Sequence, residues 1–577
     1  MREIKLPRKI PKKSEINGVL TSFSKKEWAI FGLFLLAFAV SGLLILNKVN
    51  KSFMTTVPLR GGEVREGILG SPRFVNPALA YSDTDRDLVA LIYSGLIRKD
   101  PEGALVPDLA VSYEVSKDGM TYTFVLKDDL AFHDGRALTA DDVIFTIEKI
   151  KDPIIKSPRK ASFEGVTVEK VDAGTVRFAL KQPYASFLEN MTLGIMPKHV
   201  WENSPLELNE SNTDPVGSGP YMIKSIEKES SGIIRSYILS ANKKFALGAP
   251  YVESLMLHFY PNEGEMVKAL EGGTVDQISS ITPALADGLK EEGYRIESSV
   301  LPRIFGLFFN QNQNQIFTNK KVVKAISDAI DKERIIDSVL SGYGTSIDSP
   351  IPKAGTGEKT KNNNSREEII KKIQEDLAKD GWKAGTSGFL EKTATVNKKK
   401  TSTILGFSIS TGNAPELSKS AELIKEDLAK VGINVEIKTF DVGNLNQTVI
   451  RPRKYDALLF GEIINNESDL YAFWHSSQRK DPGLNVAIYT SAKADQMLED
   501  AFITLDPEAR AKKYVQFESE IKKDMPAIFL YSPNFIYVVK KDLEGLMLRG
   551  ITSPSDRFLA AHKWYTQNDN VWKIFAR

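Results

Sequence analysis

A run of nineteen uncharged residues, from Trp28 to Leu46, limits the fold of this chain more than any other feature. As a helix it would span roughly 28 Å, close to the thickness of a bilayer's hydrocarbon core. Residues 1–27 carry eight basic and three acidic side chains, and such a basic flank tends to stay in the cytoplasm. The sequence therefore predicts a basic cytoplasmic arm at 1–27, a transmembrane anchor at 28–46, a tether at 47–58 and an extracytoplasmic body after them.

A second interpretation of the apolar run stays open. The tripeptide Ala37-Phe38-Ala39 has the form of a signal-peptidase site, with Trp28 to Leu36 as the apolar region of a signal peptide. The apolar run continues beyond that site through Leu43 to Leu46, which favours an uncleaved span. We predict the anchor, so the chain is expected in the cell membrane as a single-pass protein.

The composition excludes several classes of protein. The chain has no cysteine, which excludes disulfides, thiol nucleophiles, Cys-ligated zinc and a lipid-modified cysteine. Any attachment to a membrane must therefore come from the chain itself. The formal net charge is +2, which argues against a general nucleic-acid binder.

The body alternates between strand and helix signals. Apolar and polar residues alternate on both sides of Asp118-Gly119 and of Asp172-Ala173-Gly174, which predicts two β-hairpins. Thr139 and Asp142 resemble a capping box in front of an apolar helical stripe. Further helical signals are the stripe from Val322 to Ile330 and two copies of a Glu-Asp-Leu-Ala-Lys segment, each followed by glycine at Gly381 and Gly432. The polar stretches 353–366 and 392–402 are expected to be exposed loops.

No catalytic motif stands out in the sequence. It contains no P-loop, no H-E-x-x-H and no G-x-S-x-G. Its five histidines are scattered without ligand spacing. We therefore expect no enzyme activity, no metal site and no cofactor, although catalytic groups can also assemble from distant positions.

A dense set of short motifs carries a resemblance to a known family. Leu105 to Ala110 reads LVPDLA, Asp118 to Phe124 reads DGMTYTF, and Phe132 to Gly135 reads FHDG. Leu138 to Val143 and Val216 to Tyr221, which reads VGSGPY, follow in order. Together with later segments, such as Lys321 to Asp331, these motifs closely resemble the family 5 extracellular solute-binding proteins, the peptide- and nickel-type receptors of ABC importers. The resemblance spans about residues 60 to 560.

The resemblance implies an α/β fold of the type II periplasmic-binding-protein kind. Two lobes are expected, joined by crossing strands, with one N-terminal transmembrane helix in front of them. Lobe one would comprise residues 59–309 and 532–577, with an extra subdomain at about 86–194, and lobe two would comprise 310–531. The FHDG motif is expected to be structural rather than ligand-binding.

The resemblance also implies a function. Relatives close around a ligand, most often an extended peptide, and hand it to the permease subunits of an ABC transporter without changing it. We therefore expect a monomeric receptor whose partners are a small solute, foremost a peptide, and those permease subunits. Two alternatives stay open: an extracytoplasmic hydrolase acting on carbohydrates, and a ligand sensor that serves no transporter.

The family pattern breaks at its ligand-binding segment. Peptide-binding relatives usually have Gly-Trp there, followed shortly by an aspartate that holds the peptide's amino terminus, whereas this chain reads GEIINNESD from Gly461 to Asp469. Glu462 stands at the tryptophan position and Asn465 near the aspartate. Either Glu462 or Asp469 could supply the missing charge from a shifted position, or the ligand is not a free peptide. We expect Glu462 to make the charged contact; pairing with Arg451 or Arg453 is the structural alternative. For the aromatic residues that follow, lobe core is the alternative to ligand contact. The predicted ligand-binding residues are Tyr81, Asp83, Arg303, Phe305, Gly461, Glu462, Asn465, Trp474 and His475.

Overall fold

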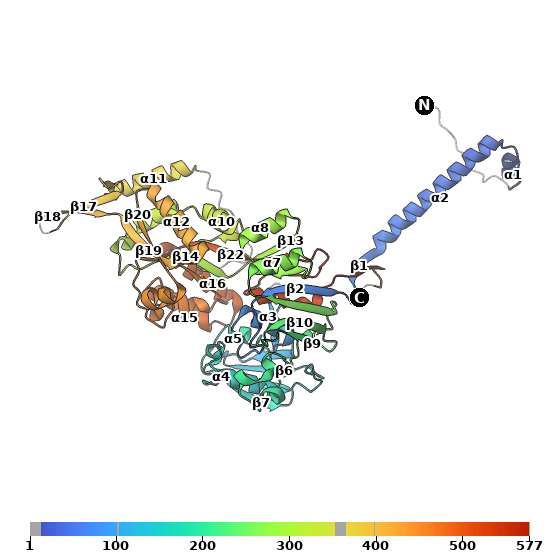
Figure 1. Cartoon of the computed structure of the whole chain (residues 1–577), viewed down its shortest axis with the longest axis horizontal. Helices are drawn as coiled ribbons and strands as arrows, with labels where there is room; N and C mark the ends of the chain where they lie inside the picture. The colour runs from blue at the N-terminus through green and yellow to red at the C-terminus, as the bar shows by residue number, and fades with distance from the viewer. Residues whose placement is uncertain (1–12, 101–102, 352–364, 397–398, 465, 576–577) are drawn as a thin grey trace. The chain divides into compact units, whose positions relative to one another are not determined.

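The computed structural model describes residues 13–100, 103–351, 365–396, 399–464 and 466–575. The chain divides into two compact units. One unit comprises Met1–Leu59 and Gln567–Arg577, and the other, the body, comprises Arg60–Thr566. We describe each unit by itself (Figure 1).

The first unit is built on a long apolar helix. Helix α1 (Lys13–Thr21) is followed by α2 (Lys25–Phe53), whose start is closed by a capping box between Ser24 and Glu27. The predicted anchor at 28–46 lies inside α2, and no part of its most apolar stretch is buried. Among the described residues, α2 is the one helix that is long and apolar enough to cross a membrane.

The residues predicted to form a tether have regular structure. Helix α2 continues to Phe53, and β1 (Met54–Pro58) then pairs antiparallel with β23 (Asn568–Trp572). The prediction placed the whole of 532–577 in lobe one, but the residues from Gln567 onward belong to the first unit because of this pairing. We call β1 and β23 together the ribbon.

The body is organised around one mixed sheet. Its strand order is β20-β19-β21-β14-β22-β12-β2-β11-β10-β9, and β13 and β15 both pair with β22 off this path. In sheet order, the strands are β20 (Asn434–Phe440), β19 (Gly406–Gly412), β21 (Ala457–Ile463), β14 (Arg303–Phe309), β22 (Ala527–Val539), β12 (Gln277–Ser279), β2 (Glu63–Leu69), β11 (Ser254–Tyr260), β10 (Ile234–Ala241) and β9 (Tyr221–Lys228), with β13 (Arg295–Val300) and β15 (Gly344–Ser346) at the side.

Strand β22 belongs to both halves of this sheet. Its first part pairs with β14 and β15, with Tyr531 opposite Phe305, and its second part pairs with β12 and β13, with Asn534 opposite Val300. The second connection between the halves is the short link from β13 to β14 through Leu301 and Pro302. We call the part built on β2 and β9–β13 the first lobe and the part built on β14–β21 the second lobe.

The predicted lobe boundary at 309/310 separates β14 from its partners. All seven residues of β14 pair with β21 in the second lobe. The pairing therefore favours a division near Leu301, although the lobe limits remain a prediction.

The predicted subdomain region of the first lobe contains a small antiparallel sheet of order β5-β6-β8-β7. Both predicted hairpins are confirmed, because β5 pairs with β6 and β7 pairs with β8. Helix α4 begins where predicted, with the Asp142 carboxylate accepting hydrogen bonds from the Thr139 amide at 2.9 Å and the Thr139 hydroxyl at 3.2 Å. The elements are β5 (Ala110–Val115), β6 (Thr121–Leu126), α4 (Ala140–Lys151), β7 (Thr167–Asp172) and β8 (Thr175–Ala179).

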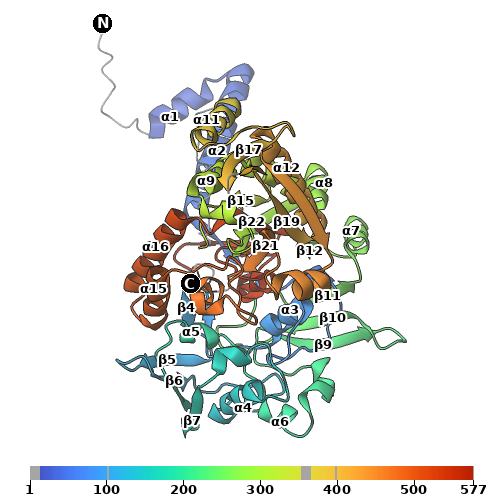
Figure 2. The ribbon, with the colours of Figure 1, turned by 90° about the vertical axis from the view of Figure 1, so that its left-hand side faces the viewer.

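Helices cover both lobes. In Figure 2 the small sheet and α4 lie at the opposite end of the body from α11 and α12. The first lobe has α3 (Asp83–Ile92), α5 (Phe187–Asn190), α6 (Lys198–Trp201), α7 (Glu263–Glu271) and α8 (Pro283–Glu291). The second lobe has α9 (Lys320–Ala329), α10 (Lys332–Leu340), α11 (Arg366–Lys379), α12 (Pro415–Lys430), α13 (Val442–Asn444), α14 (Asp469–Trp474), α15 (Ala492–Ile503) and α16 (Pro507–Asp524).

The helical predictions for the second lobe are confirmed, whereas one loop prediction is wrong. Gly381 and Gly432 follow the ends of α11 and α12 with φ of +92° and +81°, a backbone region that glycine adopts without strain. The stretch 392–402 is not a loop, because β17 (Leu390–Val396) and β18 (Lys399–Ile404) form an antiparallel hairpin. Most of the stretch 353–366 lies outside the described residues.

A buried ionic network fixes the return of the chain to the first lobe. The Arg557 guanidinium, wholly buried, donates to Glu66 at 2.7 and 2.9 Å and to Asp87 at 2.7 and 2.9 Å. The Tyr537 hydroxyl and the Gln277 amide donate to the other oxygen of Glu66, each at 2.8 Å. Four strands and helices distant in sequence therefore meet at one arginine that follows β22.

Candidate functional site at the lobe crossing

The lobe crossing brings four predicted ligand-binding residues onto two paired strands. At the end of β14 nearest the crossing, Arg303 lies opposite Ile463, Ile304 opposite Glu462, and Phe305 opposite Gly461. The Ile464 amide then donates to the Pro302 carbonyl at 2.8 Å. The segment after β21 is thereby held against the link between the lobes.

Several buried polar atoms on the strands near this crossing have no partner. The Arg303 Nε, the Ser532 hydroxyl and the side-chain carbonyl of Asn534 are buried without a hydrogen bond to any described residue. So are the Tyr343 hydroxyl and both carboxyl oxygens of Glu462. Buried polar atoms are usually satisfied, so each of these unsatisfied atoms calls for a ligand or bound water.

Glu462 is also unpartnered, but it lies on the other face of the sheet from Arg303, because its partner across the strands is Ile304. Its exposed fraction is 2%, and isolation from water raises its pKa well above the usual value. Side chains alternate along a strand, so Glu462 points to the face of β21 that holds Leu458 and Phe460, both part of an apolar cluster around Trp474. Burial without a partner therefore favours the neutral, protonated form of Glu462 in the free protein.

The structural alternative for Glu462 is wrong. Arg453 donates to the carbonyls of Ile450, Arg479 and Gly483, at 2.7, 3.0 and 2.7 Å. Arg451 lies 3.7 Å from the Asp481 carboxylate. Neither arginine neutralises Glu462.

Gly461 serves a purpose different from the one expected. We expected glycine there to let a ligand backbone approach, but a Cβ at this position would lie 2.8 Å from the Phe305 ring. Phe305 in turn stacks on Tyr531 with ring centroids 5.0 Å apart. In this conformation the Phe305 ring fills the space over Gly461.

Trp474 and His475 lie within the second lobe's own packing. Trp474 is fully buried and packs against Phe308 and Phe529. The His475 ring bonds Ser477 at 2.7 Å and Glu499 at 3.2 Å. This is the lobe-core alternative for both residues, and Asn465 lies outside the described residues.

Tyr81 and Asp83 stand at the start of α3 in the first lobe. Tyr81 is half exposed, and its hydroxyl donates to the Lys156 carbonyl at 2.7 Å. Asp83 pairs with Arg86 on the same helix. Among the described residues, neither side chain bonds to β14 or β21, so their place in a ligand site stays a prediction.

Sequence reasoning missed the residues through which the lobes touch. The Tyr184 hydroxyl lies 3.1 Å from the Ser468 hydroxyl, inside the predicted ligand segment 461–469. Tyr184 also stacks on Phe502, with centroids 4.8 Å apart, and the Ala185 amide donates to the Phe502 carbonyl at 3.0 Å. No local motif marks Tyr184, because its role depends on a partner almost three hundred residues away.

A basic side chain lies near this contact. Arg159 is partly buried, and desolvation lowers its pKa. Tyr184 and Asp469 favour its charged form, whereas Arg86 opposes it. The lobe contact thus places cationic groups from the first lobe close to the segment that follows β21.

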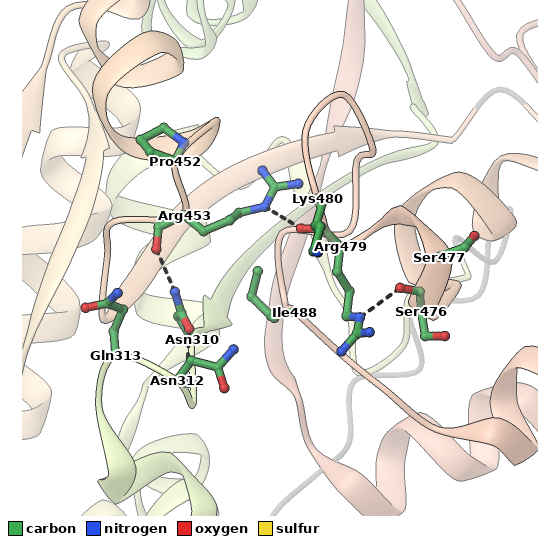
Figure 3. A pocket seen from close by; sticks show the side chains of 10 residues that line it. All are labelled: Asn310, Asn312, Gln313, Pro452, Arg453, Ser476, Ser477, Arg479, Lys480 and Ile488. Atoms are coloured by element: carbon green, nitrogen blue, oxygen red, sulfur yellow. Dashed lines mark hydrogen bonds between the residues drawn. The ribbon is translucent and has the colours of Figure 1, made fainter.

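A separate cavity of about 480 Å³ lies at the other end of β14, within the second lobe. Figure 3 shows Arg453 and Arg479 in its wall, each bonded to carbonyls of neighbouring segments. Their guanidinium groups hold loops together, so this cavity gives no direct sign of a ligand. Its wall is formed by Asn310, Asn312, Gln313, Pro452, Arg453, Ser476, Ser477, Arg479, Lys480 and Ile488.

Two motifs of the resemblance are joined by one histidine. His133 Nε2 bonds the Gly219 carbonyl at 3.1 Å, and the Gly217 amide donates to Nδ1 at 3.3 Å. Burial lowers the pKa of His133 to about 4, so the ring is neutral. A Cβ on Gly217 would lie 2.0 Å from the Ile92 carbonyl oxygen. These contacts support the structural interpretation of the FHDG motif.

No group of three or more His, Asp or Glu side chains suited to a metal occurs among the described residues. The crossing offers one acid, one guanidinium, hydroxyls and an amide. Such a set binds hydrogen-bonding and charged groups of an organic solute.

Comparison with known proteins gives consistent matches. A family profile described as "Bacterial extracellular solute-binding proteins, family 5 Middle" matches residues 104–483. The oligopeptide-binding protein AppA of Bacillus subtilis is 30% identical over 500 residues, which cover 85% of this chain and 89% of AppA.

Solved structures give the same result. AppA from Bacillus subtilis in complex with a nonapeptide is 27% identical with a TM-score of 0.61, covering 88% of this chain and 99% of that one. NikZ from Campylobacter jejuni in complex with Ni(L-His) is 27% identical with a TM-score of 0.65, covering 87% and 99%. The matches confirm the resemblance seen in the motifs and the two-lobed α/β fold.

Proposed function

The chain belongs to the family 5 bacterial extracellular solute-binding proteins, and from this premise we propose that it is a membrane-tethered receptor for peptides. It binds a peptide between its lobes and delivers it to the permease subunits of an ABC importer. The solute leaves unchanged, so the protein is a carrier rather than an enzyme. It acts as a monomer on the outer side of the cell membrane.

Glu462 is the observation that carries the peptide proposal. An unpartnered buried acid is costly, since a buried polar group without a hydrogen bond loses about 1–3 kcal/mol. A cationic group, such as a peptide's terminal ammonium, offsets that cost by forming a charge-assisted hydrogen bond. A cation beside Glu462 would lower the pKa that burial has raised, and so favour its charged form.

The rest of the crossing suits an extended backbone. Ser532 and Asn534 lie on β22, Arg303 begins β14, and Tyr343 directly precedes β15, which pairs with β22; each offers a hydrogen-bonding atom. A peptide in extended form needs such groups along its length, as at a sheet edge. The named relatives AppA and NikZ bind an oligopeptide and a nickel–histidine complex, respectively.

Closure of the two lobes on each other would bend the chain at their two connections, β22 and the link from β13 to β14. A ligand that contacts both lobes favours the conformation in which they meet and shifts a pre-existing equilibrium. Ser468, in the segment after β21, bonds Tyr184 of the first lobe, so this segment would contact both the ligand and the other lobe.

The tether rests on α2. The helix is apolar, unburied and continuous through the Ala37-Phe38-Ala39 tripeptide as far as Phe53. Its last turns contact β23, so cleavage after Ala39 would leave an exposed apolar helical end on the ribbon. These observations favour an uncleaved anchor.

The test is to identify the solute that accompanies the protein. The full chain is purified in detergent without added ligand, and acid-released molecules are identified by mass spectrometry. We expect short peptides from the wild type and from Glu436→Gln, whose carboxylate is exposed on β20, and far fewer from Glu462→Gln. Sugars or a metal chelate in place of peptides would overturn the ligand class.

A further inference from the structure

The outer end of α2 is joined to the C-terminus of the chain. The indole Nε1 of Trp572 donates to the Asn50 side chain at 2.8 Å, and the Lys573 amide donates to the Phe53 carbonyl at 2.8 Å. Within the ribbon, Met54 lies opposite Trp572 and Pro58 opposite Asn568. The C-terminal segment therefore begins beside the last turn of the apolar helix.

The position of this contact along α2 matches the membrane interface. Asn50 is four residues beyond Leu46, or about 6 Å along a helix. The polar layer on each side of a bilayer's hydrocarbon core is roughly 5–7 Å thick. If Trp28 to Leu46 span the core, Asn50 and Trp572 lie at the level of the lipid headgroups.

The exposed side chains from Trp572 to Phe575 suit a position at the level of the lipid headgroups. Trp572 is 47% exposed, Ile574 76% and Phe575 73%, while Phe53 beside them is 58% exposed. The Trp572 ring has its polar atom satisfied by Asn50 and its apolar surface free. Tryptophan with one polar edge and one apolar body is enriched at membrane interfaces.

Membrane-spanning helices commonly carry aromatic rings at both membrane–water interfaces, an arrangement called the aromatic belt. At its inner end, Trp28 packs against Phe23 and Phe31 with ring centroids 5.8 Å from each. Beyond Leu46, α2 itself has no tryptophan or tyrosine. Trp572 supplies the missing ring about 33 Å further along the helix, close to the core thickness plus part of a headgroup layer.

Basic side chains surround the exposed apolar ones. Lys48 and Lys51 lie on the last turns of α2, and Lys573 follows Trp572. Lysines flanking apolar side chains suit an interface with anionic lipid headgroups. Charge and apolar exposure thus point to the same partner.

We propose that the segment Trp572–Phe575 inserts into the outer interface of the same bilayer that α2 spans. This inference rests on the proposed tether. The body is then connected to the membrane through both of its chain ends, since Arg60 and Thr566 each lead into the ribbon. The partner is the lipid surface itself, an apolar layer below anionic and zwitterionic headgroups.

The absence of cysteine makes a direct test possible. Single cysteines are introduced into the full chain as Ile574→Cys, Val40→Cys in α2, and Ser231→Cys in an exposed turn of the body, and each is labelled with an environment-sensitive fluorophore. The proteins are reconstituted into phosphatidylcholine vesicles containing one quarter phosphatidylglycerol, with and without a lipid-borne spin-label quencher. We expect the label at Ile574 to be quenched about as strongly as that at Val40 and several-fold more than that at Ser231.

The outcomes separate the two proposals. Quenching at Val40 but not at Ile574 leaves the tether standing and overturns the interfacial role of the C-terminus. Quenching at neither site overturns both. Because Ile574 is exposed, its replacement should not affect folding, and Phe575→Cys provides a second label with the same expected result.

Discussion

Replacing Glu462 by glutamine keeps the shape of the side chain and removes its titration. In the free protein the acid is buried without a partner, and its pKa is raised well above the usual 4.5. An acid whose folded-state pKa is raised contributes stability below its unfolded pKa and loses it as pH rises toward the folded value. We therefore expect the wild type to lose stability from about pH 4.5 upward because of this residue.

The size of that loss follows from proton linkage. One fully linked proton changes the free energy of unfolding by about 1.4 kcal/mol per pH unit. Glu462→Gln lacks this slope, so its melting temperature should rise relative to that of the wild type as the pH increases above about 4.5. Glu436→Gln, on exposed β20, should follow the wild type.

Whereas Glu462→Gln should raise the stability of the empty protein relative to the wild type, it should weaken ligand binding. A charge-assisted hydrogen bond to a desolvated carboxylate contributes about 1.5–3 kcal/mol, so Glu462→Gln should weaken binding of a cationic peptide roughly ten- to a hundredfold. Binding to the wild type should also release protons, because an ammonium group beside Glu462 lowers the pKa that burial has raised.

Calorimetric titration in two buffers of different ionisation enthalpy measures both quantities. The wild type should show a buffer-dependent binding enthalpy, and the variant should not. Unchanged affinity with no proton release would refute the role of Glu462 in binding. A lower melting temperature of the empty variant at neutral pH would refute the absence of a partner.

Three further predictions concern stability and closure. Arg557→Ala leaves Glu66 and Asp87 buried without their cation, so we expect a loss of about 3–5 kcal/mol, seen as a sharply lower melting temperature; an unchanged value would contradict the network. His133 has its pKa lowered to about 4 by burial, and a base with a lowered folded-state pKa costs stability as pH falls, so melting temperature should decline from about pH 6.5 to 4 and His133→Gln should reduce that decline. Tyr184→Ala removes the ring stack and hydrogen bond between the lobes, so a nitroxide pair with one label on each lobe should give a broader distance distribution in the ligand-free protein; an unchanged distribution would show that the contact does not hold the lobes.

Local features of the chain were readable from its sequence. The apolar span, the two hairpins, the capping box at Thr139 and the glycine-terminated helices α11 and α12 all appear as predicted. Each depends on residues within a few positions of one another, where periodicity and backbone preference act directly. The motif set identified the family because its short segments keep their order along the chain.

The hairpin of β17 and β18 shows where local reading fails. Its sequence is rich in lysine and threonine, and polarity suggested a loop although threonine favours strands. Strand formation there depends on a pairing partner and not on apolar alternation alone.

Only the tertiary structure decided which residues meet. Sequence reasoning singled out Glu462, but its burial without a partner, the Phe305 ring over Gly461 and the core position of Trp474 depend on packing between strands that are distant in the chain. The same holds for the pairing of β1 with β23, whose residues Thr56 and Asn570 are 514 positions apart. Local propensity fixes each element, whereas contacts across such separations are selected by the burial and hydrogen bonding of the whole fold, which no short window of sequence contains.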